Sequence, residues 1–522
     1  MYRTVGLILL AAAVCHPSRA QTLRSVQQRI ADGVLEGVVS ADGKVRTFKG
    51  VPFAAPPVGN LRWKPPQPVI PWDGVRKAVE YGPRPMQGRI YSDMIFHDSG
   101  PSEDCLYLNL WLPEDQPNKK LPVMVWTFGG GFMAGSTSEP RQDGGNLSKK
   151  GVLVVSMNYR LGVFGFMAHP ELSQESGRNA SGNYGLMDQI AALQWVKKNI
   201  SAFGGDPDNV TIFGESAGSS SVSALVASPL AKGLFHRAIG ESGALFPSKQ
   251  RTPTRLEAEK TALAFAQSAF GSSSLDTLRA KSAQELLDAS LKEPRPRFHV
   301  AIDGYVLPAD GPTIYAAGRQ SHVPLLAGWN KDEGSPGTLL GKDSPTLANF
   351  TSHAKERFGP RADAFLKVYA ASTDAEAGRA AADFGSDDST GHAMWRWIEL
   401  HRSTAQSPVY RYKFEQDLPL ERGAPVDTPP RSPHASEIEY VFRVLPSRDL
   451  PWTKEHREVS ELMASYWTNF AKTGNPNGPG LPEWPVYDTS TQFAVMHLKS
   501  PPEVAPATDR ARHEFLEEIR SK

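Results

Sequence analysis

The amino-acid sequence predicts an α/β fold built on a large, mostly parallel sheet. Short apolar runs alternate along the chain with segments of helical periodicity, which is typical of α/β proteins. The runs are nearly continuous in hydrophobicity, as expected of strands that are covered on both faces. No internal repeat and no Gly/Ser linker divides the chain into separate units.

Four apolar runs are the predicted buried strands. Each is rich in aliphatic residues and bounded by Gly or Asn, and they span Leu121–Phe128, Gly151–Tyr159, Asn209–Ser216 and Val323–Asn330. Between them, Ile190, Leu193 and Val196 recur at helical spacing and predict a helix. The small residues that follow Ser216 predict a second helix, pressed closely onto the sheet.

Two regions are less regular, about Pro247–Pro296 and about Asp343–Pro430. They combine charged helical patterns with Pro-rich ends. We expect both to be helical elements laid over the sheet, where they would shape a substrate pocket.

Composition excludes several classes of partner. The chain has 522 residues, 22% of them charged, and a formal net charge of +1. This balance is typical of soluble globular proteins and gives no electrostatic reason to bind nucleic acid or an anionic membrane. Length alone would suggest about three domains. The absence of linkers instead favours one domain over residues 21–522, with a small molecule as its partner.

The N-terminus predicts export. Arg3 precedes an apolar run, Val5–Val14, and then Ser18–Ala20 offers a small-x-small cleavage site. The run is too short to span a bilayer, so residues 1–20 are predicted to be a signal peptide cleaved after Ala20, giving a secreted or periplasmic protein. A hydrophobic helix packed on the fold and a lipid anchor at Cys15 are the alternatives. Cleavage would leave Cys105 as the only cysteine.

A candidate nucleophile follows one of the predicted strands. Gly214–Gly218 reads G-x-S-x-G, with Glu215 directly before Ser216. Between a strand and a helix, this pattern predicts a sharp turn that lifts the serine hydroxyl out of the sheet, close to the positive end of the helix. The alternative is an ordinary helix-capping serine.

Three further features supply the other parts of a serine hydrolase. Three glycines, Gly129–Gly131, follow Phe128, and their N–H groups could converge on an oxyanion, although a flexible turn would also fit. Asp332 and Glu333 follow a predicted strand, and His434 lies in a Pro-rich loop. The chain order serine, acid, histidine favours a triad but leaves both carboxylates as candidates. No metal or cofactor motif occurs, so none is expected.

Almost end to end, the chain resembles the type-B carboxylesterases, the family that includes cholinesterases. The resemblance rests on long segments such as "FKGVPFAAPPVGNLRWKPP", "SEDCLYLNLW", "NYRLGVFGF", "GWNKDEGS", "HASEIEYVF" and "WTNFAKTGNPN". It implies an α/β-hydrolase fold, a large central sheet flanked by helices, with inserted helical regions shaping a substrate gorge. It also implies a catalytic triad of Ser216, His434 and Glu333 rather than Asp332. The implied oxyanion donors are the backbone N–H groups of Gly130, Gly131 and Ala217, and the implied structural ion pairs are Arg62–Glu103 and Arg160–Asp188.

The chain departs from this family pattern around the triple glycine. Phe128 stands where many relatives have His, so a polar contact to the loop is lost. Cys105 lacks its usual upstream partner, since Pro85 occupies that place, and the loop Met86–Asp104 should be less constrained. That loop also contains no Trp, the residue that holds quaternary ammonium groups in cholinesterases, so a choline ester is an unfavourable substrate.

The expected function is hydrolysis of small-molecule carboxylic esters through an acyl-enzyme, with broad specificity. An acyltransferase or a lipase would use the same triad. An inactive, neuroligin-like adhesion protein is the alternative from another class, and it predicts a broken triad and a membrane anchor. Here the three triad positions are filled, and the C-terminal tail is charged. The oligomeric state is not predicted.

Overall fold

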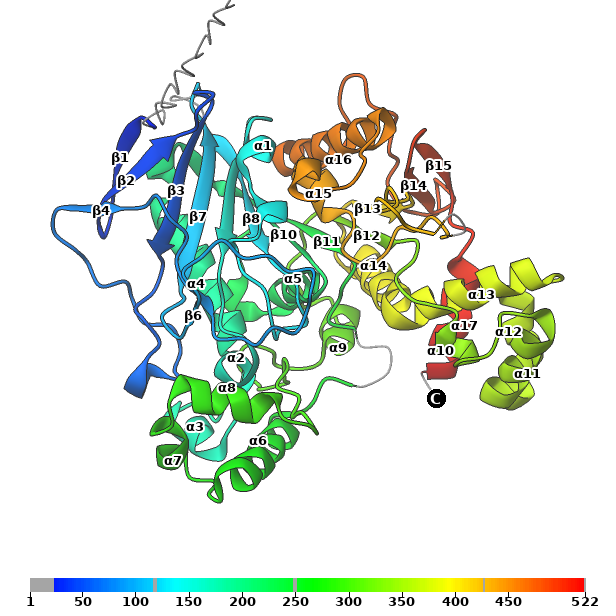
Figure 1. Ribbon diagram of the computed structural model, residues 1–522, viewed down its shortest axis with the longest axis horizontal. Helices are drawn as coiled ribbons and strands as arrows, with labels where there is room; N and C mark the ends of the chain where they lie inside the picture. Colours follow the sequence, from blue (N-terminus) through cyan, green and yellow to red (C-terminus); the bar gives the residue numbers. More distant parts are fainter. Residues whose placement is uncertain (1–22, 116–119, 247–250, 426–427, 521–522) are drawn as a thin grey trace, which may run out of the picture.

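A 13-stranded mixed sheet forms the centre of the molecule (Figure 1). The computed structural model describes residues 23–115, 120–246, 251–425 and 428–520, so the predicted signal peptide lies outside the described residues. The strands follow the order β1-β2-β3-β7-β9-β8-β10-β11-β12-β13-β14-β15, with β4 paired to β2. They span Ser25–Ile30 (β1), Gly33–Val39 (β2), Val45–Pro52 (β3), Val75–Lys77 (β4), Tyr107–Pro113 (β7), Leu121–Thr127 (β8), Leu153–Met157 (β9), Gly205–Glu215 (β10), Arg237–Glu241 (β11), Leu325–Asn330 (β12), Val409–Phe414 (β13), Ala494–Leu498 (β14) and Glu503–Pro506 (β15), while Arg84–Pro85 (β5) and Pro101–Ser102 (β6) form a separate pair.

The centre of the sheet is parallel and its edges are antiparallel. From β9 to β14 every neighbouring pair runs parallel, whereas β1, β2, β3 and β7 pair antiparallel, as β14 does with β15. The α/β prediction and its mostly parallel core are therefore confirmed. All four predicted strands are present, as β8, β9, β10 and β12.

One central strand contradicts the sequence prediction. The region 343–430 was expected to lie over the sheet, yet β13 within it pairs with β12 and β14 inside the sheet. All six residues of β13 are buried, including Arg411 and Lys413. These two charged residues break the apolar pattern on which the strand predictions depend. Arg411 is accommodated by an ion pair with Asp509 and by the face of Trp329, whose ring centre is 4.3 Å from the guanidinium.

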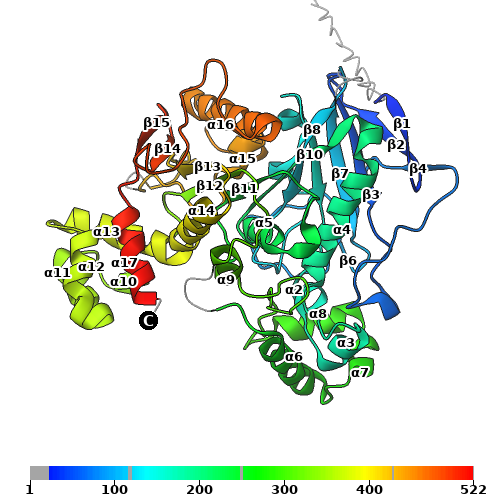
Figure 2. The ribbon, with the colours of Figure 1, turned by 180° about the vertical axis from the view of Figure 1, so that it is seen from behind.

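Helices cover both faces of the sheet, and each face has its own apolar core. Alternate residues of β8 divide between them: Val123 and Val125 belong to one core, Met124 and Trp126 to the other. The first core includes α4 and α5, the two helices predicted beside the sheet, and the second includes α16 (Figures 1 and 2). The helices span Gly145–Ser148 (α1), Gly162–Phe166 (α2), Pro170–Glu175 (α3), Tyr184–Asn199 (α4), Ala217–Ala227 (α5), Arg255–Phe270 (α6), Leu275–Arg279 (α7), Ala283–Leu291 (α8), Gly311–Ala316 (α9), Gly337–Leu340 (α10), Leu347–Phe358 (α11), Ala362–Val368 (α12), Asp374–Ser386 (α13), His392–Thr404 (α14), Ile438–Val441 (α15), Lys454–Thr473 (α16) and Arg510–Arg520 (α17).

The irregular regions are largely helical, as expected. Pro247–Pro296 contains α6, α7 and α8. The second region contains α11, α12 and α13, which pack with α10 and α17 around a third apolar cluster that includes Phe350, Phe365 and Phe515. In Figure 1 this group lies beside the C-terminal helix, away from β1 to β4. A π-helical turn, Asp387–Gly391, joins α13 to α14.

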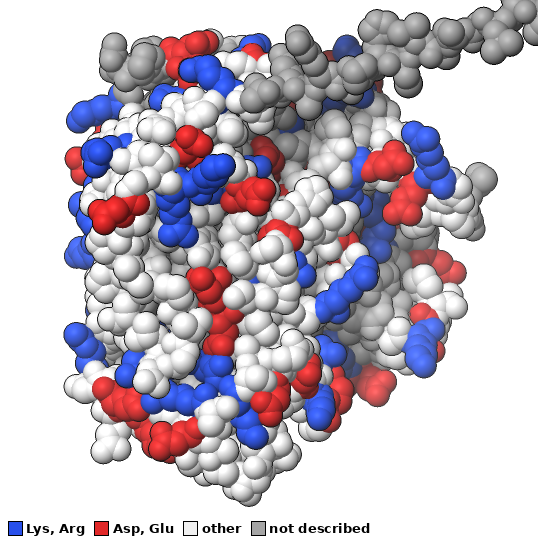
Figure 3. Space-filling view, turned by 60° about the vertical axis from the view of Figure 1, so that its left-hand side comes forward, with Lys and Arg blue, Asp and Glu red and all other residues white. Residues whose placement is uncertain are grey.

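On the face in Figure 3, basic and acidic side chains are interspersed, so this face has no patch of one sign that would attract a polyanion. In the part of the chain that the structure describes, no helix is both long and apolar enough to cross a membrane.

Both ion pairs implied by the family resemblance are present, and the Arg160–Asp188 pair is fully buried. Arg160 and Asp188 form a bidentate pair, with Nε–Oδ2 and Nη2–Oδ1 distances of 2.8 and 2.7 Å, and their side chains are 3% and 0% exposed. Arg62 meets Glu103 through two bonds of 2.6 Å. The first pair ties the segment that follows β9 to α4.

Replacing Asp188 by Ala should therefore destabilise the protein strongly. The change leaves a buried guanidinium without its counter-ion, and we expect the free energy of unfolding to fall by about 3–5 kcal/mol. Urea denaturation followed by circular dichroism measures the change. Glu458→Ala, which removes the exposed pair Lys454–Glu458, is the control and should cost at most about 0.5 kcal/mol. Equal losses in the two variants would contradict the structural role of the buried pair.

Candidate active site

Ser216 occupies a strained turn between β10 and α5. Its φ and ψ are 56° and −121°, a region that non-glycine residues rarely adopt. The neighbouring glycines are sterically required, because a Cβ on Gly218 would stand 2.0 Å from the carbonyl oxygen of Thr127, and one on Gly214 would stand 2.6 Å from it. The G-x-S-x-G pattern thus forms the sharp strand-to-helix turn that the sequence predicted.

A chain of hydrogen bonds joins the three predicted triad residues. His434 Nε2 is 2.9 Å from Ser216 Oγ, and His434 Nδ1 is 2.6 Å from Glu333 Oε2. The other oxygen of Glu333 accepts the N–H of Asn330 at 2.9 Å. Glu333 is fully buried, whereas the imidazole keeps 42% of its side-chain area exposed. Asp332, the alternative acid, bonds instead to Arg379 and to the backbone of Ser432.

Electrostatics favours a charged Glu333 beside the imidazole. Burial raises the pKa of this carboxyl, but the imidazole of His434 and the N–H of Asn330 outweigh burial and bring the pKa below its usual value. Burial also disfavours the imidazolium, yet the carboxylates of Glu215 and Glu333 raise the pKa of His434 overall. The arrangement therefore stabilises a proton on the imidazole once the ring has accepted one.

Further carboxyl groups surround Glu333 and His434, and the sequence analysis did not find all of them. Glu215 Oε1 lies 3.2 Å from His434 Nε2. Glu437 accepts from Asn330 Nδ2 at 2.5 Å, and Glu241 accepts from Trp467 Nε1 at 2.8 Å. Burial raises the pKa of all three carboxyls. Glu437 follows His434 by three residues, but its contact with Asn330 depends on packing that no local sequence pattern reveals.

The triple-glycine loop lies against the Ser216 turn. A Cβ on Gly129 would stand 2.9 Å from Ser216 Cβ and 2.7 Å from Glu215 Oε2. Gly130 and Gly131 have φ values of 99° and 63°. Within the described residues, the N–H groups of Gly130, Gly131 and Ala217 bond to no acceptor. The loop and the start of α5 therefore present free amide donors beside the serine, the arrangement that an oxyanion requires.

At Phe128, packing takes the place of the polar contact to the triple-glycine loop that a histidine would make. Its ring is buried and stacks on Tyr159, with ring centres 4.6 Å apart. The hydroxyl of Tyr159 donates to the carbonyl oxygen of Phe128 at 2.9 Å. Stacking and a main-chain hydrogen bond thus hold Phe128, the residue that precedes the triple-glycine loop.

Hydrogen bonds restrain the loop Met86–Asp104 in the absence of a disulfide. Cys105 is buried and free. The Gln87 amide donates to the carbonyl oxygen of Gly135 at 2.7 Å and accepts the N–H of Gly135 at 2.9 Å. Asp98 accepts from both Ser136 and Ser138. These bonds join the loop to the segment that follows the triple glycine.

The same loop reaches over Gly130 and Gly131. The Tyr91 hydroxyl and the Met94 methyl group each lie 3.0 Å from the point that a Cβ on Gly131 or Gly130, respectively, would occupy. No sequence signal marked these side chains, because their contacts are distant along the chain. In the described part of the chain, no cluster of His, Cys, Asp or Glu could hold a metal ion.

Comparisons with known proteins show which proteins the chain is similar to. A family model described as the carboxylesterase family matches residues 24–516. The chain is 37% identical to the para-nitrobenzyl esterase of Bacillus subtilis (strain 168), over 88% of this chain and 92% of that protein. It is 37% identical to the fumonisin B1 esterase of Sphingopyxis macrogoltabida, over 87% and 83%. A solved structure of a PNB esterase superposes with a TM-score of 0.77 at 35% identity, over 94% of this chain and 99% of that one.

Removing the charge of Glu215 should shift the pH dependence of the site. Because this carboxylate stabilises the imidazolium, Glu215→Gln lowers the pKa of His434. A base must be neutral, and its neutral form then persists to lower pH, so the acid limb of kcat/KM should move down by about one unit. The measurement is kcat/KM for p-nitrophenyl acetate between about pH 4 and 9.

The matched control is Glu439→Gln. Glu439 is also a buried glutamate, but it faces Arg141 and Arg448 rather than the imidazole. In Glu439→Gln, the acid limb of kcat/KM should coincide with that of the wild type. An acid limb that stays in place or moves upward in Glu215→Gln would contradict the assigned electrostatic role.

Proposed function

The chain belongs to the carboxylesterase family and is a carboxylic ester hydrolase, and we propose that it acts through an acyl-enzyme formed on Ser216. The observation that carries this proposal is the hydrogen-bonded series Glu333–His434–Ser216. A serine hydroxyl becomes an effective nucleophile when a neutral imidazole can take its proton, and a buried carboxylate then stabilises the imidazolium.

Acylation begins when Ser216 Oγ attacks the ester carbonyl carbon and His434 Nε2 takes the hydroxyl proton. The carbonyl oxygen becomes an oxyanion that accepts the N–H groups of Gly130, Gly131 and Ala217. As the tetrahedral intermediate collapses, the imidazolium gives its proton to the leaving alcohol. Glu333 stays ionised throughout and fixes the orientation of the ring.

Deacylation repeats these steps with water. His434 takes a proton from the water molecule, the resulting hydroxide attacks the acyl carbon, and the same N–H groups hold the second oxyanion. Collapse releases the carboxylic acid and returns the proton to Ser216. An alcohol in place of water would give acyl transfer through the same residues.

We infer a broad preference among small-molecule esters. Relatives with esterase names span para-nitrobenzyl esterase, fumonisin B1 esterase and carboxylesterases, so the family scaffold accommodates varied alcohols. The loop Met86–Asp104 contains no Trp, so choline esters lack the indole face that binds quaternary ammonium most strongly.

We also propose that residues 1–20 direct export and that residues 21–522 form one catalytic domain. The sequence supports cleavage after Ala20, and the first described strand begins shortly after that point, at Ser25. Mass spectrometry of the protein recovered from the medium or periplasm should give an N-terminus at Gln21. An intact Met1 on the exported protein would contradict the signal-peptide proposal.

Ser216→Ala should abolish hydrolysis without unfolding the protein. Without the hydroxyl no acyl-enzyme can form, so kcat/KM for p-nitrophenyl acetate should fall by about 10⁴-fold or more. Ser220→Ala is the matched control, a serine on the same helix α5, and should retain wild-type activity. Circular dichroism checks the fold of both variants. Turnover by Ser216→Ala at the wild-type rate would place the nucleophile elsewhere.

A further inference from the structure

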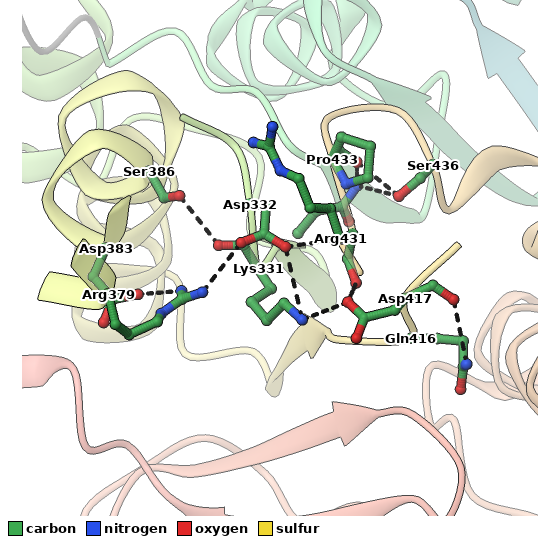
Figure 4. Close-up of polar contacts among 12 residues, drawn as sticks. Lys331, Asp332, Arg379, Asp383, Ser386, Gln416, Asp417, Arg431, Pro433 and Ser436 are labelled. Carbon is green, nitrogen blue, oxygen red and sulfur yellow. Dashed lines mark hydrogen bonds and ion pairs between the residues drawn. The ribbon is translucent and has the colours of Figure 1, made fainter. Parts of the chain in front are cut away.

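The residues just before Glu333 contact the segment that carries His434. We call residues 415–437, between β13 and α15, the base segment. Lys331, Asp332 and Glu333 follow β12 directly, and each meets a different point of it. Figure 4 shows Asp332 at the centre of these contacts, with Lys331 and Asp417 on one side and Arg379 on the other.

The contacts follow the same chain order along the two segments. Lys331 Nζ donates to Asp417, near the start of the base segment. The N–H of Asp332 donates to the carbonyl oxygen of Ser432 at 3.1 Å, and Asp332 Oδ2 accepts the N–H of Ser432 at 2.8 Å. Glu333 then meets His434 two residues further on. Residue 332 thus binds the backbone just before the base, while residue 333 binds the base itself.

The base segment needs such an attachment because regular structure does not supply one. Its described residues include no helix or strand, apart from an isolated bridge between Pro433 and Asp332. A loop of this length is costly to order, and the imidazole at its end must stay within proton-transfer distance of Ser216. The hydrogen-bonded pair at Asp332 and Ser432 fixes the loop two residues from that imidazole.

The side chain of Asp332 is itself held on its other side. It is only 8% exposed, and Arg379 Nη1, from α13, donates to its Oδ1 at 3.2 Å. Lys331 Nζ lies 3.7 Å from its Oδ2. Arg379 in turn bonds to Asp383 on the same helix. The carboxylate therefore joins three parts of the molecule: α13, the end of β12 and the base segment.

We propose that Asp332 is a positioning residue that keeps His434 in register with Glu333 and Ser216. It touches neither substrate nor reacting atoms; it acts by fixing the backbone at Ser432. This inference rests on the proposed function, in which His434 is the base. It assigns a role to the second carboxylate of the Asp332–Glu333 pair, which the catalytic steps leave unused.

Three variants test the proposal. Asp332→Ala removes both the acceptor for Ser432 and the anion for Arg379, whereas Asp332→Asn keeps an acceptor oxygen. Asp383→Ala is the matched control, since it removes the other partner of Arg379 and touches no residue of the base segment. Each is assayed for kcat and KM on p-nitrophenyl acetate, for the acid limb of kcat/KM, and for the rate of covalent labelling of Ser216 by a fluorophosphonate.

Asp332→Ala should lower kcat by about 10²-fold, the effect of a displacement of about 1 Å at a catalytic group, with KM within about threefold of wild type. Labelling should slow in parallel. The acid limb should move to lower pH, because an imidazole that loses Glu333 has a lower pKa. Asp332→Asn should recover most of the lost rate, and Asp383→Ala should match the wild type.

A purely structural role predicts a different result. Asp332→Ala would then have a lower melting temperature, but its kcat, acid limb and labelling rate per folded molecule would equal those of the wild type, and this outcome overturns the proposal. The Ser216→Ala variant distinguishes a failure of the positioning role from a failure of the proposed function. If that variant is inactive while Asp332→Ala is normal, only the positioning role fails; if it is fully active, the proposed function fails.

Discussion

The parallel register of five neighbouring strands is the constraint on which the site depends. Strands β8, β10, β11, β12 and β13 pair in parallel, so their carboxyl ends meet at one edge of the sheet. Four of these ends contribute one part each: the triple-glycine loop after β8, Ser216 after β10, Glu333 after β12 and the base segment after β13. After β11, the Ser242 hydroxyl donates to Glu437 at 3.4 Å. Residues hundreds of positions apart in the chain thus need only short local turns to meet. A slip of one residue in any pair would turn the adjoining side chains to the opposite face.

Buried charge is the second constraint, because the site gathers several carboxyl groups around one imidazole. An isolated carboxylate in the interior is expensive, and burial accordingly raises the pKa of Glu215, Glu241 and Glu437. Glu333 differs because His434 and a backbone N–H compensate its charge directly. Glu333 therefore supplies its charge on the side of the imidazole opposite the serine, at Nδ1, whereas Glu215 acts on the protonated ring from the Nε2 side.

Sequence reasoning succeeded where a physical requirement is local. The glycines around Ser216 are dictated by contacts within one turn and its neighbouring strand, and continuous apolar runs marked β8, β9, β10 and β12. The family resemblance selected Glu333 over Asp332, a choice that the residues alone left open. The strand β13 was missed because Arg411 and Lys413 are buried through long-range partners rather than by an apolar pattern. Glu437 and Gln87 were missed for the same reason, and Asp332 was named only as a candidate acid: the contacts of all three exist only once the chain has folded.

Two departures from the family pattern, Phe128 and the unpaired Cys105, bear on the triple-glycine loop, and the structure compensates both of them locally. Stacking on Tyr159 replaces the polar residue expected at Phe128, and the bonds from Gln87 and Asp98 restrain the loop that a disulfide would otherwise close. Both compensations act through backbone groups on either side of Gly130 and Gly131, at the carbonyl oxygen of Phe128 and at the peptide of Gly135. The geometry of the amide donors is thus maintained by hydrogen bonds and packing. Since such contacts are individually weak, the loop depends on several of them together, whereas a covalent cross-link would act alone.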